Sequence, residues 1–309
     1  DLKTINASDR VTLQNDIDLS EFDFTISKFD GKFNGNGHTL HNLTDVLFNQ
    51  FEGTMKHLNI QDIHFNSRKS GSLATEIRDA VIDNVNIYME NSLSSKTQFQ
   101  SFAYKIEDSK LSNCDIQIKY KGNTCFGIAD SLRRTTLKKC SVKLNVSADM
   151  CAGLARQTIA INTQTSIHSC TTTGEIKSSK CAGLVTELHG KISKCESNLT
   201  IKTKLTDKPN QVLGGLVGTL KSGKIQESIF SGNILNTDPN VEAVGGIAGK
   251  NENTIENCVN TGNISTKSKA PTGGLVGINQ NEGLIESSRN TGKIIGIEDV
   301  GGLIGKSDG

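Results

Sequence analysis

Eight cysteines are the residues of this 309-residue sequence with the widest chemical repertoire: Cys114, Cys125, Cys140, Cys151, Cys170, Cys181, Cys195 and Cys258. Cysteine can form disulfides or bind zinc, but no CxxC spacing occurs, and a zinc site is not expected. All eight stand at repeated positions that other copies fill with Val, Leu, Thr or Ser. Side chains in register along a repeat point the same way, which suits disulfide geometry poorly. We therefore predict small buried thiols, with the disulfide framework of a secreted chain as the alternative.

Six histidines are the next candidates for catalysis or metal binding: His38, His41, His57, His64, His168 and His189. His38 and His41 are close enough in sequence to place two rings together, whereas His168 follows the apolar Ile167 and is expected to face outward. The sequence contains no HExxH motif, so the zinc site of a metallopeptidase is not encoded in it. Polar turn residues are the favoured interpretation of these histidines, and we predict neither a metal nor a cofactor.

Acidic side chains are the remaining candidates for catalysis. Glycoside hydrolysis needs two carboxylates at a fixed separation. Glu76, Asp79 and Asp83 lie near each other in sequence, and residues 236–238 read Asn-Thr-Asp without a supporting second motif. The repeat described below varies only from 26 to 32 residues, which leaves no long loop to wall a cleft. We therefore predict that this segment is not an enzyme and assign it no catalytic, cofactor or metal residues, with the ligand-binding residues unknown.

One segment, residues 132–143, is strongly basic, with Arg133, Arg134, Lys138, Lys139 and Lys143. The formal net charge of the whole chain is only +1, and no aromatic residues alternate with these cations to stack on bases. We expect no nucleic-acid binding. A solvated strand face is the favoured interpretation, and a site for an anionic glycan is the alternative.

All of these candidate residues belong to one sequence that is built from repeats. The second Gly of a Gly-Gly-Leu phrase, or its equivalent, recurs with a mean step of about 28 residues. Its ten positions are Val46, Ser72, Ser101, Gly127, Gly153, Gly183, Gly215, Gly246, Gly274 and Gly302. The phrase TGGLVGINQNEGLIESSRNTGKI, residues 272–294, is one complete copy.

Two further apolar elements follow the Gly phrase, and the second of them occurs in the later copies. One is an apolar residue with a small or apolar residue three positions later, as in Leu111/Cys114 and Ile255/Cys258. The other is Gly, a polar residue and Ile, as at residues 262–264. The segments are short and alternate in polarity, which indicates strands, and the three-residue step indicates a corner. One coil cannot bury its own apolar face, so the pattern predicts an all-β parallel β-helix of about ten coils. We expect right-handed winding.

These residues resemble a known repeat family. The phrase GGLVGINQNEGLIESSRNTGKI, residues 273–294, resembles the GLUG-type repeat, GGLVGxNxGxIxxSxNTGxI. The N-terminal segment FDGKFNGNGHTLHNL, residues 29–43, is similar to the segment that commonly precedes such repeats. The family occurs in bacterial surface and secreted proteins, including non-catalytic regions of IgA-specific zinc metallopeptidases and large adhesins. The resemblance implies a parallel β-helix of the pectin-lyase-like type.

The domain organisation follows from the repeat. We predict an N-terminal cap with the first coil in residues 1–45 and β-helix repeats in residues 46–309, which break off within a copy and are expected to be truncated. No apolar run is long enough to span a membrane. Pro209, Pro239 and Pro271 precede Gly-Gly segments, where the longest connections also lie, so this edge of the rod is a candidate binding edge.

The functional prediction is a non-catalytic stalk or binding region of a larger bacterial surface or secreted protein that contacts a host protein or glycan. One alternative is a polysaccharide lyase or hydrolase on the same fold. The other is a secreted effector inside a host cell, where eight free thiols suit a reducing compartment.

Overall fold

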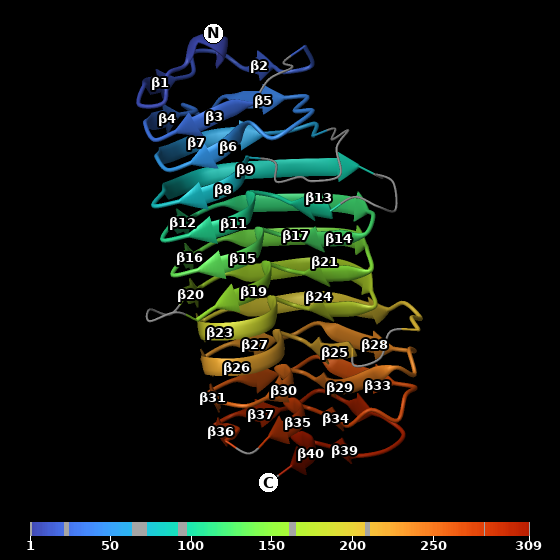
Figure 1. Ribbon diagram of the computed structural model, residues 1–309. Helices are drawn as coiled ribbons and strands as arrows, with labels where there is room; N and C mark the ends of the chain where they lie inside the picture. The colour runs from blue at the N-terminus through green and yellow to red at the C-terminus, as the bar shows by residue number, and fades with distance from the viewer. Residues whose placement is uncertain are drawn as a thin grey trace.

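Short strands stacked in parallel make up the fold. The computed structural model describes residues 2–21, 25–63, 73–91, 98–160, 165–207, 211–280 and 282–308. The two termini lie at opposite ends of a rod, and the strands follow one another along it in chain order (Figure 1). The one helical element of the described residues is the short 3-10 helix η1 (Leu2–Thr4), which precedes the first strand. All strand pairs in the described part of the chain are parallel, as the sequence pattern predicts.

Four files of strands run along the rod. The small sheet consists of β10 (Gln98–Gln100), β14 (Thr124–Phe126), β18 (Met150–Ala152), β22 (Lys180–Ala182), β25 (Gln211–Gly214), β29 (Val241–Gly245), β34 (Thr272–Gly273) and β39 (Val300–Gly301). The glycine face, which follows it in each coil, consists of β3 (Ile26–Phe29), β6 (Phe48–Phe51), β8 (Ala74–Arg78), β11 (Ala103–Glu107), β15 (Ala129–Arg133), β19 (Ala155–Ile159), β23 (Val185–Ser193), β26 (Val217–Gln226), β30 (Ala248–Asn251), β35 (Val276–Gln280) and β40 (Ile304–Asp308).

The corner file and the long-strand face complete each coil, with some strands extending from one file into the next. The corner file consists of β1 (Arg10–Thr12), β4 (Lys32–Asn34), β7 (Thr54–Ile60), β9 (Val81–Asn91), β12 (Lys110–Ser112), β16 (Thr136–Lys138), β20 (Thr165–His168), β31 (Thr254–Glu256) and β36 (Leu284–Glu286). The long-strand face consists of β2 (Ile17–Asp18), β5 (Thr39–His41), the ends of β7 and β9, β13 (Asp115–Lys121), β17 (Ser141–Ser147), β21 (Thr171–Ser178), β24 (Glu196–Thr203), β27 (Ile229–Phe230), β28 (Asn233–Asn236), β32 (Val259–Asn260), β33 (Asn263–Thr266), β37 (Arg289–Asn290) and β38 (Ile294–Ile295).

The register of the strands confirms the predicted repeat. Ala103, two residues after the repeat position Ser101, pairs with Ala74 and Ala129, and pairing at the same position continues to Ile304. Among the described residues, however, only eight copies contribute a strand to the small sheet. The residues just before Val46 form no strand, and Ser72 lies outside the described residues. The structure therefore has about eight complete coils where the sequence predicts about ten.

The predicted corners are left-handed residues. In the pair Leu111/Cys114, Asn113 has a φ of 54°, and in Ile255/Cys258, Asn257 has a φ of 52°. Both members of each pair are buried, so their side chains point inward although they are three positions apart. A polar side chain at the corner then faces solvent.

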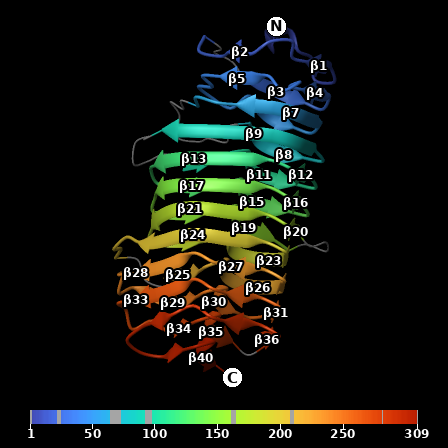
Figure 2. The ribbon, with the colours of Figure 1, turned by 180° about the vertical axis from the view of Figure 1, so that it is seen from behind.

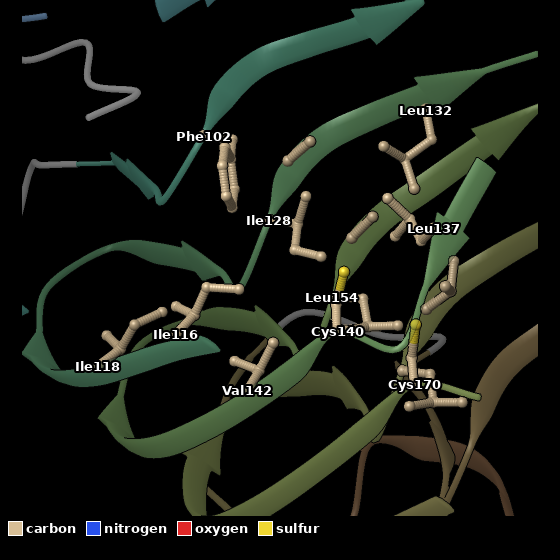
Figure 3. Packing of buried hydrophobic residues seen from close by; sticks show 14 of the residues in the cluster. Phe102, Ile116, Ile118, Ile128, Leu132, Leu137, Cys140, Val142, Leu154 and Cys170 are labelled. Carbon is tan, nitrogen blue, oxygen red and sulfur yellow. The ribbon is translucent and has the colours of Figure 1, made fainter. Parts of the chain in front are cut away.

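A continuous apolar core fills the rod from Leu2 to Val276. Figure 3 shows how side chains from different files converge, with Phe102 and Ile128 from the glycine-face side and Ile116 and Val142 from the long-strand face. The strands of residues 1–45 pair in register with the coils that follow, for example Ile26 with Phe48. The boundary at residue 45 and the right-handed winding stay predictions.

Candidate binding face

The long-strand face presents a wide polar surface built by strict alternation. In β13 the residues alternate between buried Ile116, Ile118 and Tyr120 and the outward Gln117 and Lys119. β17 and β24 repeat the alternation, and the long arrows of β9, β13, β17, β21 and β24 lie one above another in both views of the rod (Figures 1 and 2). Because neighbouring strands are in register, outward side chains form straight files along the rod axis.

A first hollow of about 370 Å³ lies at the N-terminal end of this surface, lined by Asn59, Ile60, Gln61, Asn86, Ile87, Tyr88, Asp115 and Gln117. Its carboxamides are held in place across the rungs. Asn86 Nδ2 donates to Asn59 Oδ1 at 3.0 Å, and the Asp115 backbone N–H donates to Asn86 Oδ1 at 3.1 Å. Tyr88 is 41% exposed. The hollow thus combines fixed amide groups with one aromatic face.

A second hollow of about 520 Å³ lies further along the same surface, lined by Glu90, Lys119, Tyr120, Lys121, Asn145, Val146, Ser147, Glu175 and Lys177. Two of its acidic groups are paired: Lys119 with Glu90, and Lys202 with Glu175 at 2.7 Å. The Lys119 ammonium lowers the pKa of the Glu90 carboxyl, so this pair is charged at neutral pH. The two hollows are adjacent, because β9 contributes Tyr88 to one and Glu90 to the other.

The cysteines are free and buried, as predicted. Cys125, Cys151 and Cys181 pair in register along the small sheet. Burial raises the pKa of the Cys151 and Cys181 thiols well above their ordinary value, and it raises that of Cys258 to about 11. Figure 3 shows Cys140 and Cys170 among apolar side chains. The thiols of Cys151, Cys181 and Cys258 are therefore protonated at neutral pH and unsuited to nucleophilic chemistry.

Five cysteines have a role that the sequence analysis missed. Cys114, Cys140, Cys170, Cys195 and Cys258 directly follow a left-handed corner, and each thiol contacts the carbonyl oxygen two residues earlier. The same position also accepts hydrogen bonds. The Cys170 N–H donates to Cys195 Sγ at 3.4 Å, and the Cys195 N–H donates to Ser228 Oγ at 3.1 Å. Interchange of Cys with Ser in the repeat was the available signal, since both residues supply this donor and acceptor.

The described histidines have separate partners. His38 contacts Asp16 and His41 contacts Asp62, each at 3.1 Å, so the two rings do not share a ligand. His57 occupies a left-handed corner, as a polar turn residue should. The half-buried His168 contacts Ser193, and His189 contacts Ser222 and Glu187. His64 lies outside the described residues.

The basic segment 132–143 does not form one patch. Arg133 pairs with the buried Glu107 at 2.8 Å, and Arg134 pairs with Asp108. Lys138 and Lys139 are exposed at a corner, as predicted, whereas Lys143 lies on the long-strand face. The cations are thus divided between faces, and the arginines are neutralised by carboxylates of the neighbouring coil. The absence of nucleic-acid binding stays a prediction.

The acidic candidate residues have separate partners and do not form one cluster. Glu76 pairs with Arg78 at 2.6 Å, and Asp79 occupies a left-handed corner. Asp83 accepts hydrogen bonds from Ser112 Oγ and Asn113 Nδ2, both at 2.7 Å, which lower the pKa of its carboxyl. In the segment 236–238, Asp238 is fully buried. Within the described ranges, no group of three or more His, Cys, Asp or Glu side chains is arranged to hold a metal ion.

The proposed binding edge is partly internal. Asn236 is buried and bonds to Thr203, Thr266 and Ser268 of the neighbouring coils. The Pro271 carbonyl accepts the N–H of Val244 at 3.0 Å, so this connection is tied to the small sheet. Pro209 lies outside the described residues. Where the chain is described, it contains no helix with the length and apolarity needed to cross a membrane.

One comparison with known protein families agrees with the resemblance seen in the sequence. Residues 240–265 match the family model of the GLUG motif, which is confirmed in this chain. No curated protein matches the chain. Among solved structures, an IgA1 protease is similar with a TM-score of 0.43 and 18% identity over 91% of this chain, which spans 21% of that protein. A putative immunoglobulin A1 protease from Bacteroides ovatus gives a TM-score of 0.41 and 15% identity, covering 86% of this chain and 73% of that one.

Proposed function

We propose that this chain is a non-catalytic β-solenoid region of a larger bacterial surface or secreted protein, a stalk that also contacts a host protein or glycan. The observation that carries the proposal is the continuous parallel pairing of the glycine face, which runs from Ile26 to Ile304 with one register shift, between Leu188 and His189. A ladder of this kind forms a stiff, regular rod with a large solvent face. The GLUG match supports an extracellular location.

The stalk role is tested by changing the number of coils. Removing residues 215–273 joins Gly214 to Gly274 and deletes two coils in phase. We expect a folded rod shorter by about 10 Å, at ~4.8 Å per coil, when the maximum dimension is measured by small-angle X-ray scattering. Removing residues 215–260 joins Gly214 to Thr261 out of phase and should abolish cooperative folding. An in-phase deletion that fails to fold would contradict independent stacking.

The absence of catalysis is tested by turnover. Enzymes on solenoid folds that act on acidic polysaccharides release reducing ends or unsaturated products. We expect none from pectic and uronic-acid polysaccharides incubated with the chain. Turnover that disappears on substitution of Glu76 or Asp83 would instead establish the lyase or hydrolase alternative.

A secreted effector inside a host cell is the second candidate, and the free cysteines favour it. All eight are unpaired, which suits a reducing compartment. Thiol titration of the natively isolated protein under denaturing conditions decides whether the candidate keeps its support. A count of eight reactive thiols would support the effector candidate, and a lower count caused by disulfide bonds would contradict it.

A further inference from the structure

We infer that the two hollows of the long-strand face form one continuous site for an acidic oligosaccharide, with its anionic groups bound by Lys121 and Lys177. The inference rests on the proposed function, because it names the ligand class of a binding stalk. The hollows share β9 and together cross five neighbouring strands, from β7 to β21. The site therefore suits an extended chain that crosses the rungs.

Lys121 and Lys177 provide the charge. They occupy one outward file, separated by Ser147, so their Cα atoms lie two rungs apart, about 9.6 Å at ~4.8 Å per rung. Neither has a carboxylate partner within 4.0 Å among the described residues, unlike Lys119 and Lys202 on the same surface. Two adjacent ion pairs are thus internally neutral, while two cations remain available to a ligand.

Tyr88 and the amides of the first hollow provide the uncharged part of the site. An exposed aromatic ring offers a flat apolar face to the C–H groups of a sugar, and Asn and Gln side chains both donate and accept hydrogen bonds, as sugar hydroxyls require. The hydrogen bonds that tie Asn86 to Asn59 and to the Asp115 N–H fix these groups before a ligand arrives, which reduces the entropy cost of binding.

Other ligand classes fit less well. A peptide that binds by adding a strand needs an open edge, but β13, β17 and β21 are paired on both sides. A nucleic acid needs several stacking rings and a field of one sign, whereas this surface has one exposed tyrosine and carries Glu90, Glu175 and Glu196 among its lysines. A neutral glycan would leave the two cations without partners.

The test measures binding of defined oligosaccharides by isothermal titration calorimetry at low salt. A carboxylated probe (an oligogalacturonate) and a sulfated probe (a heparin hexasaccharide) distinguish the two sources of negative charge, and a neutral xylohexaose is the reference. We expect at least one acidic probe to bind and the neutral probe to bind much more weakly. The K121Q/K177Q variant should weaken acidic binding about tenfold or more, through loss of two charge-assisted hydrogen bonds.

The K138Q/K139Q variant is the matched control, because it removes the same charge from an exposed corner outside both hollows. It should bind the acidic probe as the unmodified chain does. Tyr88→Ala should weaken binding of every glycan that binds. The inference is overturned if no acidic probe binds or if the two double variants lose affinity equally. Neither result affects the outcome of the coil-deletion experiment, which tests the stalk proposal independently.

Discussion

At the scale of single residues, a hydroxyl or thiol side chain directly after a left-handed corner completes the backbone hydrogen bonding that the corner interrupts. Ser228 is fully buried, accepts the Cys195 N–H at 3.1 Å and donates to the Gln226 carbonyl at 2.8 Å. Buried backbone N–H groups without partners are rare because each costs free energy. In the later coils the position therefore favours small residues with a hydroxyl or thiol, whereas Leu58 and Val85 occupy it in the N-terminal coils. This explains why cysteine recurs there without disulfides.

The first prediction concerns Ser228. Ser228→Ala leaves the Cys195 N–H buried without an acceptor and should lower the free energy of unfolding by about 1–3 kcal/mol, measured by urea denaturation. Ser228→Cys should change it by less than about 1 kcal/mol, since a thiol retains a weaker form of both bonds. Ser231→Ala is the control, because Ser231 bonds to Glu196 at the exposed surface. Equal effects of the Ala and Cys substitutions would show that the hydrogen bond is irrelevant.

The second prediction concerns Cys258 and pH. Its folded-state pKa is about 11, raised from 9.0 by burial, so the unfolded chain loses this proton at lower pH than the folded chain. The associated stability is fully present below pH 9 and declines as pH rises toward 11. In Cys258→Ser this contribution is absent. The difference in unfolding free energy between the unmodified chain and the variant should therefore shift against the unmodified chain above pH 9, and a pH-independent difference would contradict the raised pKa.

At the scale of strands and coils, the features that recur in every copy were predictable from the sequence, and the irregular N-terminal copies were not. Apolar ladders such as Leu111, Leu137 and Ile167 are in register as expected, and the three-residue step is a corner because a left-handed residue separates two inward side chains. The two N-terminal copies lack the Gly phrase and also lack a described small-sheet strand, which accounts for the excess in the predicted coil number.

The candidate site was not predictable in the same way. In β13, β17 and β21 the outward positions carry no repeated residue type, so the approach of Lys121 to Lys177 depends on the register of three strands and not on any motif. The ion pairs of the basic segment 132–143 were not predictable for a related reason. Its arginines are neutralised by Glu107 and Asp108, which lie one coil earlier and about 26 residues away in sequence.

The third prediction tests how closely coils approach. A Cβ at Gly274 would lie 2.1 Å from the Gly302 carbonyl oxygen and 2.5 Å from Asn290 Cγ, whereas a Cβ at Gly302 would meet nothing within 4 Å. Gly274→Ala should therefore lower the unfolding free energy by at least about 1–3 kcal/mol. Gly302→Ala, at the same position of the next coil, should have little effect. A similar loss of unfolding free energy in both variants would show that glycine is required by the conformation within a coil and not by the close contact between coils.

At the scale of the whole molecule, apolar side chains are less well covered in the last described coil than in the internal coils. Leu275 is fully buried, but its equivalent Leu303 in the last coil is 49% exposed, and Ile285 and Ile294 are only partly buried. In a stacked solenoid each coil is stabilised mainly by its neighbours, so a coil with one neighbour has about half of the stacking contacts of an internal coil. Local stability should therefore fall toward the last coil.

The fourth prediction is a gradient of hydrogen exchange. Backbone amides of β36, β38 and β40 should exchange fastest, and those of β17 and β21 should exchange slowest, because opening an internal coil disrupts two interfaces. Leu303→Lys should leave protection in the central coils unchanged, since its side chain is half exposed. The comparison is made by mass spectrometry of peptides that cover single coils. Equal protection from β17 to β40 would mean that the rod opens only as one cooperative unit, and neighbour-by-neighbour stacking would then be the wrong description of its stability.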